Sequence, residues 1–313
     1  MAEIERRILG TTGLSVSALC LGGSGIGSMP AAFGYDVPER QAIDTVLEVL
    51  RSPINFLDTA AGYSDGESER RIGLALAEFG GVPDGVVVAT KVDPIDGDYS
   101  GAAVIRSAEG SRQRLGLDQL PLLYLHDPEP LTFVEAAAPG GPLEALVQLR
   151  EQGVAAHIGV AGGPVPLMAD FVRSGLVEVL ITHNRWTLVD RSAGDLLDLA
   201  AEHDVAVVNG APFGGGVLAK GSRAVPRYAY RDAEPAVLQA IQAIEAACER
   251  YDVPLATAAL QFSLREPRIA STIAGISRPE RVAPTVAAAT APVPQELWDE
   301  LEQLAAPADT WLY

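Results

Sequence analysis

The chain has 313 residues, of which 48% are hydrophobic and 20% charged, and its net charge at pH 7 is −18. This composition excludes a disordered chain, a collagen-like repeat and a small disulfide-stapled protein. The excess of acidic residues argues against nucleic acid and anionic membranes as partners, because both attract clusters of lysine and arginine.

Short apolar runs alternate with longer helical patterns along almost the whole chain. The runs are nearly continuous stretches of aliphatic and β-branched residues, which is typical of strands buried on both faces. In chain order, the eight expected strands are Ala18–Leu21, Ile54–Leu57, Val86–Thr90, Leu120–Leu125, Ala156–Val160, Val177–Thr182, Val205–Val208 and Ile269–Ile273.

The segments between these strands have helical periodicity, with proline or acidic residues near most of their starts. The expected helices are Glu39–Arg51, Gly66–Phe79, Glu144–Gln152, Asp195–Glu202, Pro235–Arg250 and Pro279–Ala289. This alternation, without a break in composition, predicts a single α/β domain over residues 1–313 that forms a closed (β/α)8 TIM barrel. A doubly wound open sheet is the alternative architecture.

Three segments lie outside this alternation. Arg6–Leu9 and Val16–Ala18, joined by a glycine-containing turn, predict a β-hairpin before the first barrel strand. Gln295–Leu304 predicts an extra C-terminal helix, which is followed by the apolar tail Trp311–Tyr313. Asn209–Glu234 is rich in glycine, then in basic and aromatic residues, and has no helical periodicity. Loops of that length inside a compact domain are usually functional.

The two cysteines and the N-terminus indicate the cellular compartment. Cys20 and Cys248 both lie in apolar segments, so we expect two buried, reduced thiols and no disulfide. The first residues contain no apolar signal core, and no apolar run is long enough to span a bilayer. These features predict a cytoplasmic protein.

Polar side chains follow three successive strands of the predicted barrel. Asp58 follows the second strand, with Tyr63 on the loop above it, Lys91 follows the third strand and His126 follows the fourth. Each residue alone has an ordinary structural explanation as a helix cap, a packed ring, a rim lysine or a core histidine. Reactive residues of such barrels lie at the carboxyl ends of the strands, so the combination favours a shared catalytic site.

These residue types suit proton transfer coupled to hydride transfer at a carbonyl or alcohol carbon. A free tyrosine is phenolate in only about one part in a thousand at pH 7. The ammonium of Lys91 is expected to lower the pKa of Tyr63, and Asp58 to keep that lysine charged. His126 is expected to donate a hydrogen bond to the developing alkoxide and so to orient and polarise the substrate oxygen.

Other catalytic chemistries fit the sequence poorly. The four histidines include no H-E-x-x-H pair and the chain has no cysteine cluster, so no metal is expected. The G-x-S-x-G turn of serine hydrolases is also absent from the sequence. A phosphosugar isomerase barrel has no distinctive support, because the charge is acidic and the four residues favour redox chemistry.

Two glycine-containing segments late in the chain are candidates for binding a pyrophosphate. Gly214–Ala219 contains a weak G-x-G-x-x-A pattern after the seventh strand. Ala274–Arg281, after the eighth strand, places small and basic residues at a helix N-terminus, where anions bind readily. The loops after the last two strands are also where such barrels bind phosphate.

At these positions the sequence resembles the aldo-keto reductase family over its whole length. The resemblance rests on the hairpin Leu9–Ser17, the D-T-A-x-x-Y motif at 58–63, T-K at 90–91, L-H-D at 125–127, and Pro279-Glu280-Arg281. It implies a (β/α)8 barrel whose bottom is closed by the hairpin, and NAD(P)-dependent interconversion of carbonyls and alcohols. It also implies a catalytic tetrad of Asp58, Tyr63, Lys91 and His126.

The resemblance further implies where the cofactor would bind. The expected contacts are Gly23, Asp58, Gly162, Asn184, Phe213, Gly214, Gly215, Gly216, Leu218, Gly275, Ser277, Arg278 and Arg281. Three positions depart from the family pattern. Ala161-Gly162 replaces a Ser-Asn pair, Gly210 replaces a tyrosine that stacks on the nicotinamide, and Gly275 replaces a lysine common at the 2′-phosphate. NAD and NADP are therefore both retained as cofactors.

Several stretches also resemble the branch of L-fucose and D-threo-aldose 1-dehydrogenases, among them His126–Glu129 and Arg185–Asp190. This branch implies oxidation of the C1 hydroxyl of an aldose to a lactone. The expected rim segments Gly25–Gly34, Asn209–Glu234 and Asp309–Tyr313 carry aromatic residues and are expected to bring few cationic groups close to the four catalytic residues, which favours a neutral sugar over an anionic one. An aldehyde or ketone reductase is the first alternative, and a non-catalytic, cofactor-sensing regulatory subunit is the second. The oligomeric state is left open.

Overall fold

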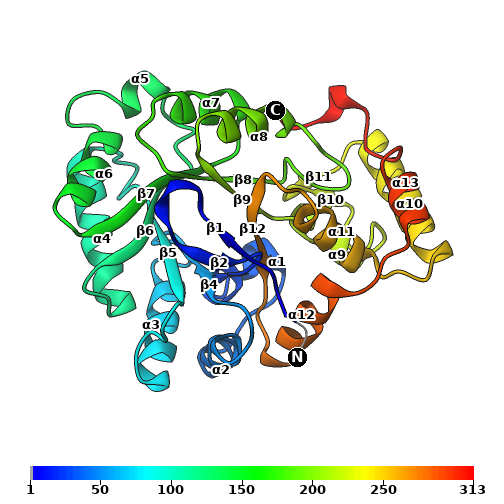
Figure 1. Ribbon diagram of the computed structural model, residues 1–313, viewed down its shortest axis with the longest axis horizontal. Helices are drawn as coiled ribbons and strands as arrows, with labels where there is room; N and C mark the ends of the chain where they lie inside the picture. The colour runs from blue at the N-terminus through cyan, green and yellow to red at the C-terminus, as the bar shows by residue number, and fades with distance from the viewer. Residues whose placement is uncertain (1–2) are drawn as a thin grey trace.

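The computed structural model describes residues 3–313, apart from the side chains of residues 31 and 32. Eight parallel strands close into a barrel in which β12 pairs with both β3 and β9, so the alternative of an open sheet is wrong (Figure 1). The strands are β3 (Leu19–Gly22), β4 (Phe56–Asp58), β5 (Val87–Val92), β6 (Leu120–His126), β7 (Ala155–Gly162), β8 (Val179–His183), β9 (Ala206–Gly210) and β12 (Ile269–Gly275).

Helices surround the barrel, as Figure 1 shows. They are α2 (Glu39–Leu50), α3 (Glu67–Phe79), α4 (Gly101–Leu115), α5 (Phe133–Ala136), α6 (Pro142–Glu151), α7 (Val165–Arg173), α8 (Gly194–Glu202), α10 (Pro235–Arg250), α11 (Leu255–Leu264) and α12 (Val282–Thr290). The six predicted helices are present, although the last begins with a separate 3-10 turn, η4 (Pro279–Arg281). Helices α4, α5, α7 and α11 are additional to the prediction.

Two of the unpredicted helices, α11 and α4, give a weak amphipathic pattern in the sequence. Helix α11 is buried along seven of its ten residues, so it lacks the polar face on which an amphipathic pattern depends. Helix α4 is rich in glycine, alanine and serine, but its ends are well defined. The Ser100 side chain accepts a hydrogen bond from the backbone N–H of Ala103, and Gly116 ends the helix in the left-handed conformation.

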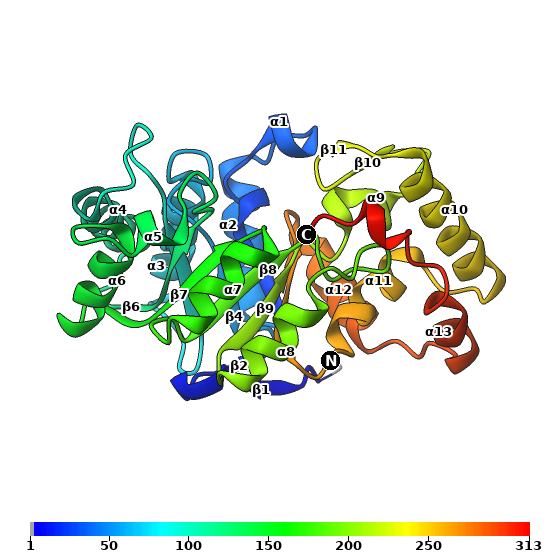
Figure 2. The ribbon, with the colours of Figure 1, turned by 90° about the horizontal axis from the view of Figure 1, so that it is seen from above.

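The two ends of the barrel are built differently. The predicted hairpin, β1 (Arg6–Ile8) paired with β2 (Ser15–Ser17), lies at one end. The other end carries α1 (Pro30–Phe33) and a small second hairpin of β10 (Arg227–Tyr228) and β11 (Arg231–Asp232), as Figure 2 shows. The carboxyl ends of the barrel strands therefore face a mouth that is lined by loops.

The long segment 209–234 and the C-terminal tail both contribute to this mouth. The segment contains two short helical turns, η3 (Gly214–Gly216) and α9 (Val217–Lys220), so the expectation of a segment without helix is corrected there. Helix α13 (Gln295–Leu301) ends three residues earlier than predicted. Beyond it, the backbone N–H of Leu312 donates to Asp190 Oδ2 over 2.8 Å, which ties the tail to the loop after β8.

The barrel interior is apolar below the mouth. Cys20 and Phe56 are fully buried there, together with Tyr124 of β6. Both cysteines are free and buried, as predicted, and burial raises the pKa of each thiol. Among the described residues, no helix is both long enough and apolar enough to cross a membrane.

Candidate active site

The four predicted catalytic side chains converge at the mouth of the barrel. Asp58 and His126 are the last residues of β4 and β6, Lys91 lies near the end of β5 between them, and the loop after β4 delivers Tyr63. The Lys91 ammonium donates to Asp58 Oδ2 over 2.7 Å, to the Thr59 carbonyl oxygen over 2.8 Å and to the Tyr63 hydroxyl over 3.2 Å. Neighbouring parallel strands therefore bring together residues that are far apart in the sequence.

The pair of Lys91 and Asp58 is almost completely shielded from solvent. Each residue is 2% exposed. A charge buried to this extent is costly unless it is paired, so each partner depends on the other. The second carboxylate oxygen of Asp58 is buried and has no hydrogen-bond partner among residues 3–313.

Burial and charge together set the protonation states of this group. Burial alone would lower the pKa of Lys91, but Asp58 and then Tyr63 raise it above its usual value, so the side chain is an ammonium. Burial raises the pKa of Tyr63 to about 12. Lys91 does lower the pKa of Tyr63, as the sequence suggests, but its effect is smaller than that of burial. The expectation of a net lowering is therefore wrong.

Tyr63 and His126 lie side by side above this pair. Their ring centroids are 5.5 Å apart and their planes are inclined at 82°, so the two rings meet edge to face. Because the Tyr63 hydroxyl accepts a hydrogen bond from Lys91, its own proton is left to donate elsewhere. This geometry provides a proton donor or acceptor next to an imidazole, with a fixed positive charge behind it.

Asp93 is a residue of this site that the sequence analysis missed. Its Oδ1 lies 2.7 Å from His126 Nδ1, and its Oδ2 accepts a hydrogen bond from the backbone N–H of Gly62 over 2.6 Å. One feature of the sequence could have indicated that Asp93 belongs to the site. Asp93 is two residues after Lys91, a spacing that places two side chains on the same side of a strand, and it directly follows the last residue of β5.

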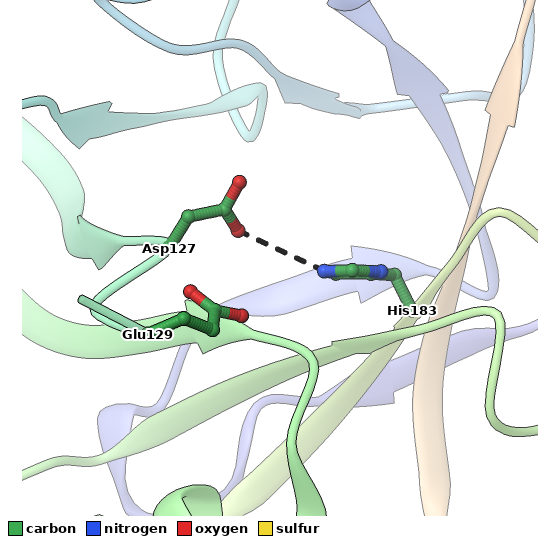
Figure 3. Close-up of side chains that lie close together, drawn as sticks. All are labelled: Asp127, Glu129 and His183. Carbon is green, nitrogen blue, oxygen red and sulfur yellow. Dashed lines mark ion pairs between the residues drawn. The ribbon is translucent and has the colours of Figure 1, made fainter. Parts of the chain in front are cut away.

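An acceptor-rich rim lies beside these residues, made by Asp127 and Glu129 after β6 and by His183 at the end of β8 (Figure 3). His183 Nε2 lies 3.7 Å from Asp127 Oδ1. Glu129 Oε1 accepts a hydrogen bond from the backbone N–H of Gly163 over 2.7 Å. The three side chains are close enough to hold a cation, but exposed acidic groups are common without one, so their spacing alone assigns no metal.

The second rim hairpin contributes an aromatic side chain to the same region. Burial, and then the negative charge of Asp127, raise the pKa of Tyr230 in the turn between β10 and β11. Tyr230 belongs to the predicted rim segment Asn209–Glu234 and is 49% exposed.

The predicted phosphate-binding segments form a surface beside the mouth. The turns η3 and η4 follow β9 and β12, which are neighbours in the barrel. A Cβ added at Gly216 or Gly275 would meet no atom within 4 Å, so the backbone there is open to a ligand. Arg278 and Arg281 are exposed and form no ion pair within residues 3–313. Backbone N–H groups with free guanidinium groups fit a pyrophosphate.

Further atoms near this surface are consistent with a ligand. Ser277 donates a hydrogen bond to the hydroxyl of Tyr35 over 3.2 Å, and Lys220 of α9 lies 5.5 Å from the centroid of the Tyr35 ring. Asn184 is 2% exposed, and its side-chain oxygen has no donor among the residues described. That oxygen would suit an amide N–H of a ligand.

Several of the remaining predicted cofactor contacts have packing roles of their own. A Cβ at Gly23 would lie 2.6 Å from the Asp58 carbonyl oxygen, and one at Gly214 would lie 2.5 Å from the Tyr228 ring. The backbone packs tightly at these positions, so they require glycine whether or not a cofactor binds. Leu218 is fully buried in the cluster next to α10 and α11, so its side chain belongs to the core.

The last three predicted positions lie in the same region. A Cβ at Gly162 would lie 2.8 Å from Met168 Cε, and one at Gly215 would lie 3.0 Å from the backbone nitrogen of Tyr230. Phe213 is partly buried against the core and precedes η3. The structure thus places these three at or near the mouth without showing a contact to a ligand.

Comparison with known proteins identifies the family. The chain is 32% identical over 322 residues to an L-galactose dehydrogenase of Arabidopsis thaliana, covering 99% of this chain and 98% of that protein. It is 29% identical to a pyridoxal 4-dehydrogenase of Microbacterium luteolum (95% and 96% covered) and 28% identical to a D-threo-aldose 1-dehydrogenase of a Pseudomonas species (93% and 94% covered).

The fold agrees with these sequence relationships. The structure of an aldo-keto reductase from Bacillus halodurans, in its holo form, matches with a TM-score of 0.79 at 25% identity, covering 98% of this chain and 97% of that one. The sequence profile of the aldo/keto reductase family matches residues 18–306. The named relatives are dehydrogenases, and the family uses NAD(P)H. The chain therefore belongs to the aldo/keto reductase family and is an oxidoreductase.

Proposed function

We propose that this enzyme oxidises the C1 hydroxyl of a neutral cyclic aldose to a lactone, with NAD(P)⁺ as the hydride acceptor. The observation that carries the proposal is the Tyr63 hydroxyl, held by the buried Lys91–Asp58 pair and set beside His126. The relatives named as L-galactose and D-threo-aldose dehydrogenases support a sugar substrate.

The proposed reaction removes one hydride and one proton from the substrate. The bound cofactor supplies the acceptor for the hydride from C1. The hydroxyl proton passes to the phenolate oxygen of Tyr63, and the carbon–oxygen bond becomes the carbonyl of the lactone. Lys91 lies 3.2 Å from that oxygen and stabilises its negative charge, and Asp58 holds Lys91 in place.

We assign the cofactor phosphates to the surface formed by η3 and η4. Gly216 and Gly275 leave the backbone open, and Ser277, Arg278 and Arg281 surround it. The nicotinamide would then lie toward the mouth, where the partnerless oxygen of Asn184 is available to its amide group.

The charges at the mouth favour a neutral substrate. Asp93, Asp127 and Glu129 lie close to His126 or to the rim beside it, and all three are acidic. The nearby guanidinium of Arg185 donates to the carbonyl oxygens of His183, Leu312 and Tyr313 over 3.3–3.4 Å. Because both terminal nitrogens of that guanidinium already donate to backbone carbonyls, it offers a carboxylated or phosphorylated sugar little compensation for the loss of its hydration.

A panel of substrates tests the proposal directly. We expect NAD(P)⁺ reduction, followed by absorbance, to be faster with neutral aldoses than with uronic acids or sugar phosphates of the same ring configuration. The matched pairs isolate the effect of the charge. Faster turnover of the acidic sugars would contradict the electrostatic argument, and the absence of oxidation with every aldose would contradict the proposed reaction.

Reduction of simple aldehydes is the second candidate. The observation in its favour is the pKa of Tyr63 of about 12, which leaves the phenol protonated at neutral pH and able to donate a proton. The same panel separates the two reactions when it includes propanal with NAD(P)H. Efficient reduction of propanal without oxidation of any aldose would favour this candidate.

Arg281 provides a test of cofactor choice. If its guanidinium binds a 2′-phosphate, Arg281→Ala is expected to weaken NADP binding by roughly 1.5–3 kcal/mol, as for other hydrogen bonds to charged groups, and to leave NAD nearly unchanged. Fluorescence titration with both cofactors measures the difference. Equal weakening of both would mean that Arg281 contacts another part of the dinucleotide, and no change would make it a solvated side chain.

A further inference from the structure

Asp127 is a charged side chain at the mouth that has no part in the proposed transfer of a proton and a hydride. It is the first residue after β6, and its backbone N–H donates to the Ala161 carbonyl oxygen over 2.8 Å. Its own carbonyl oxygen accepts a hydrogen bond from the Tyr99 hydroxyl over 3.4 Å. The φ angle of Asp127 is +38°, in the left-handed region that residues other than glycine seldom adopt. The backbone is thus held from both sides, while the side chain is 58% exposed.

The two carboxylate oxygens of Asp127 have no hydrogen-bond partner within residues 3–313. Oδ1 lies 3.7 Å from His183 Nε2 and Oδ2 lies 3.8 Å from His126 Nε2, and both distances are too long for a hydrogen bond. Figure 3 shows one oxygen facing the His183 ring and the other pointing away from it. The carboxylate therefore lies close to both imidazoles, with its lone pairs available.

The protonation state of Asp127 limits what it can bind. Desolvation tends to raise its pKa, but His183, His126 and Lys91 together hold it below the usual value of a carboxyl group. The side chain is therefore a carboxylate at neutral pH. An ionised carboxylate only accepts hydrogen bonds, so a neutral ligand that meets Asp127 has to donate to it.

The two other groups of this rim are less free to bind a ligand. Glu129 Oε1 already accepts a hydrogen bond from the backbone N–H of Gly163 over 2.7 Å. His183 Nδ1 lies 3.2 Å from the side-chain nitrogen of Asn184. Each of these two side chains therefore has one polar atom engaged by a neighbouring segment, whereas both polar atoms of Asp127 remain available.

Asp127 also lies close to the place of the reacting oxygen. Asp93 lies 2.7 Å from His126 Nδ1, so Nε2 is the ring nitrogen left to face a substrate. Because Asp127 Oδ2 lies 3.8 Å from this Nε2, a substrate oxygen bound there is next to the carboxylate. The two oxygens of a vicinal diol are close neighbours. A hydroxyl on the adjacent carbon can therefore reach Asp127 while the reacting oxygen stays at His126.

We propose that Asp127 is a specificity-determining residue that accepts a hydrogen bond from the hydroxyl on the carbon next to the reacting carbon. In the proposed function, on which this inference rests, the reacting oxygen lies at Tyr63 and His126, so this second hydroxyl belongs to C2 of the aldose. Asp127 thus selects α-hydroxylated substrates over simple aldehydes and 2-deoxy sugars. A substrate without that hydroxyl would displace water from the carboxylate without replacing its hydrogen bond.

Asp127→Gly and Asp127→Asn form a graded series at this position. Glycine and asparagine both tolerate the left-handed backbone, so neither adds strain at a φ angle of +38°. Glycine removes the acceptor, whereas the amide oxygen of asparagine is a neutral and weaker one. The matched control is Asp96→Gly, because Asp96 is exposed, carries the same charge and has a φ angle of +53° in the loop after β5.

The first measurement compares the reduction of glycolaldehyde and propanal with NAD(P)H. The two aldehydes are similar in size and differ in a hydroxyl against a methyl group next to the carbonyl carbon. The readout is the ratio of their kcat/KM values, because a change in the reactivity of Tyr63 affects both aldehydes alike. We expect the preference for glycolaldehyde to fall about tenfold or more in Asp127→Gly, to fall less in Asp127→Asn, and to persist in Asp96→Gly. An unchanged ratio in Asp127→Gly would overturn the inference.

The second measurement applies the same ratio to the oxidation of an aldose and its 2-deoxy counterpart with NAD(P)⁺. We expect the same order of variants, again with a fall of about tenfold or more in Asp127→Gly. If the wild type oxidises no aldose but Asp127→Gly loses the preference for glycolaldehyde, the proposed function fails and the role of Asp127 stands. If aldoses are oxidised and neither ratio changes in Asp127→Gly, the role of Asp127 fails and the proposed function stands.

Discussion

Tyr63→Phe is expected to lower the rate of aldose oxidation by about 10²–10⁴-fold, the range for loss of a general acid or base. The ring stays in place and only the hydroxyl that receives a hydrogen bond from Lys91 is lost. Cofactor affinity should be unchanged, because the surface to which we assign the cofactor phosphates is formed by the turns η3 and η4, after β9 and β12. Steady-state turnover and cofactor titration measure the two effects. More than about a tenth of wild-type turnover in the variant would contradict the assignment.

The pH dependence of the wild type is part of the same expectation. Oxidation needs the phenolate, and the pKa of Tyr63 is raised to about 12. Below that pKa the phenolate fraction grows about tenfold per pH unit, so kcat/KM for oxidation should keep rising through the alkaline range. In Tyr63→Phe this rise should disappear. A plateau of the wild type near neutral pH would mean that another group accepts the proton.

Lys91→Met should be the most destabilising substitution in the site. It leaves the Asp58 carboxylate buried without its partner, which typically costs about 3–5 kcal/mol when one member of a buried ion pair is removed. Urea unfolding at neutral pH, followed by circular dichroism, measures the loss. Turnover should also fall, since the Tyr63 phenolate is no longer stabilised.

The double variant Lys91→Met/Asp58→Asn is the control for that result. It removes both charges, so most of the lost unfolding free energy should return while turnover stays low. The difference between the double variant and the sum of the single variants gives the coupling energy of the pair. Additive losses would show that Lys91 and Asp58 do not depend on one another, contrary to their 2.7 Å contact.

The fold was predictable from the sequence because parallel strands that are buried on both faces consist of nearly continuous apolar residues. The continuous apolar runs located all eight barrel strands to within a few residues. Burial also explains why α11 was not predicted. A helix that is apolar on every side lacks the alternation of apolar and polar residues by which helices are recognised in a sequence. Helix α4 was missed although its capping serine and terminal glycine were present in the sequence.

Only the part of the site that is formed by residues at the carboxyl ends of the strands was predictable from the sequence. Asp58, Lys91 and His126 could be brought together from their places after three successive strands. The contact between Asp93 and His126 could not, because it depends on how far a loop residue reaches across to the next strand. The raised pKa of Tyr63 also depends on burial by surrounding loops, whose packing no pattern in the sequence predicts.

The hydrogen bonds of Lys91 have a consequence for an enzyme that handles aldehydes. A lysine amine condenses with an aldehyde to form an imine only when its nitrogen has a free lone pair. All three protons of Lys91 are engaged, by Asp58, Thr59 and Tyr63, and its pKa is raised above the usual value. The nitrogen is therefore not nucleophilic, and the enzyme is protected from covalent inactivation by aldehydes at this lysine of its active site.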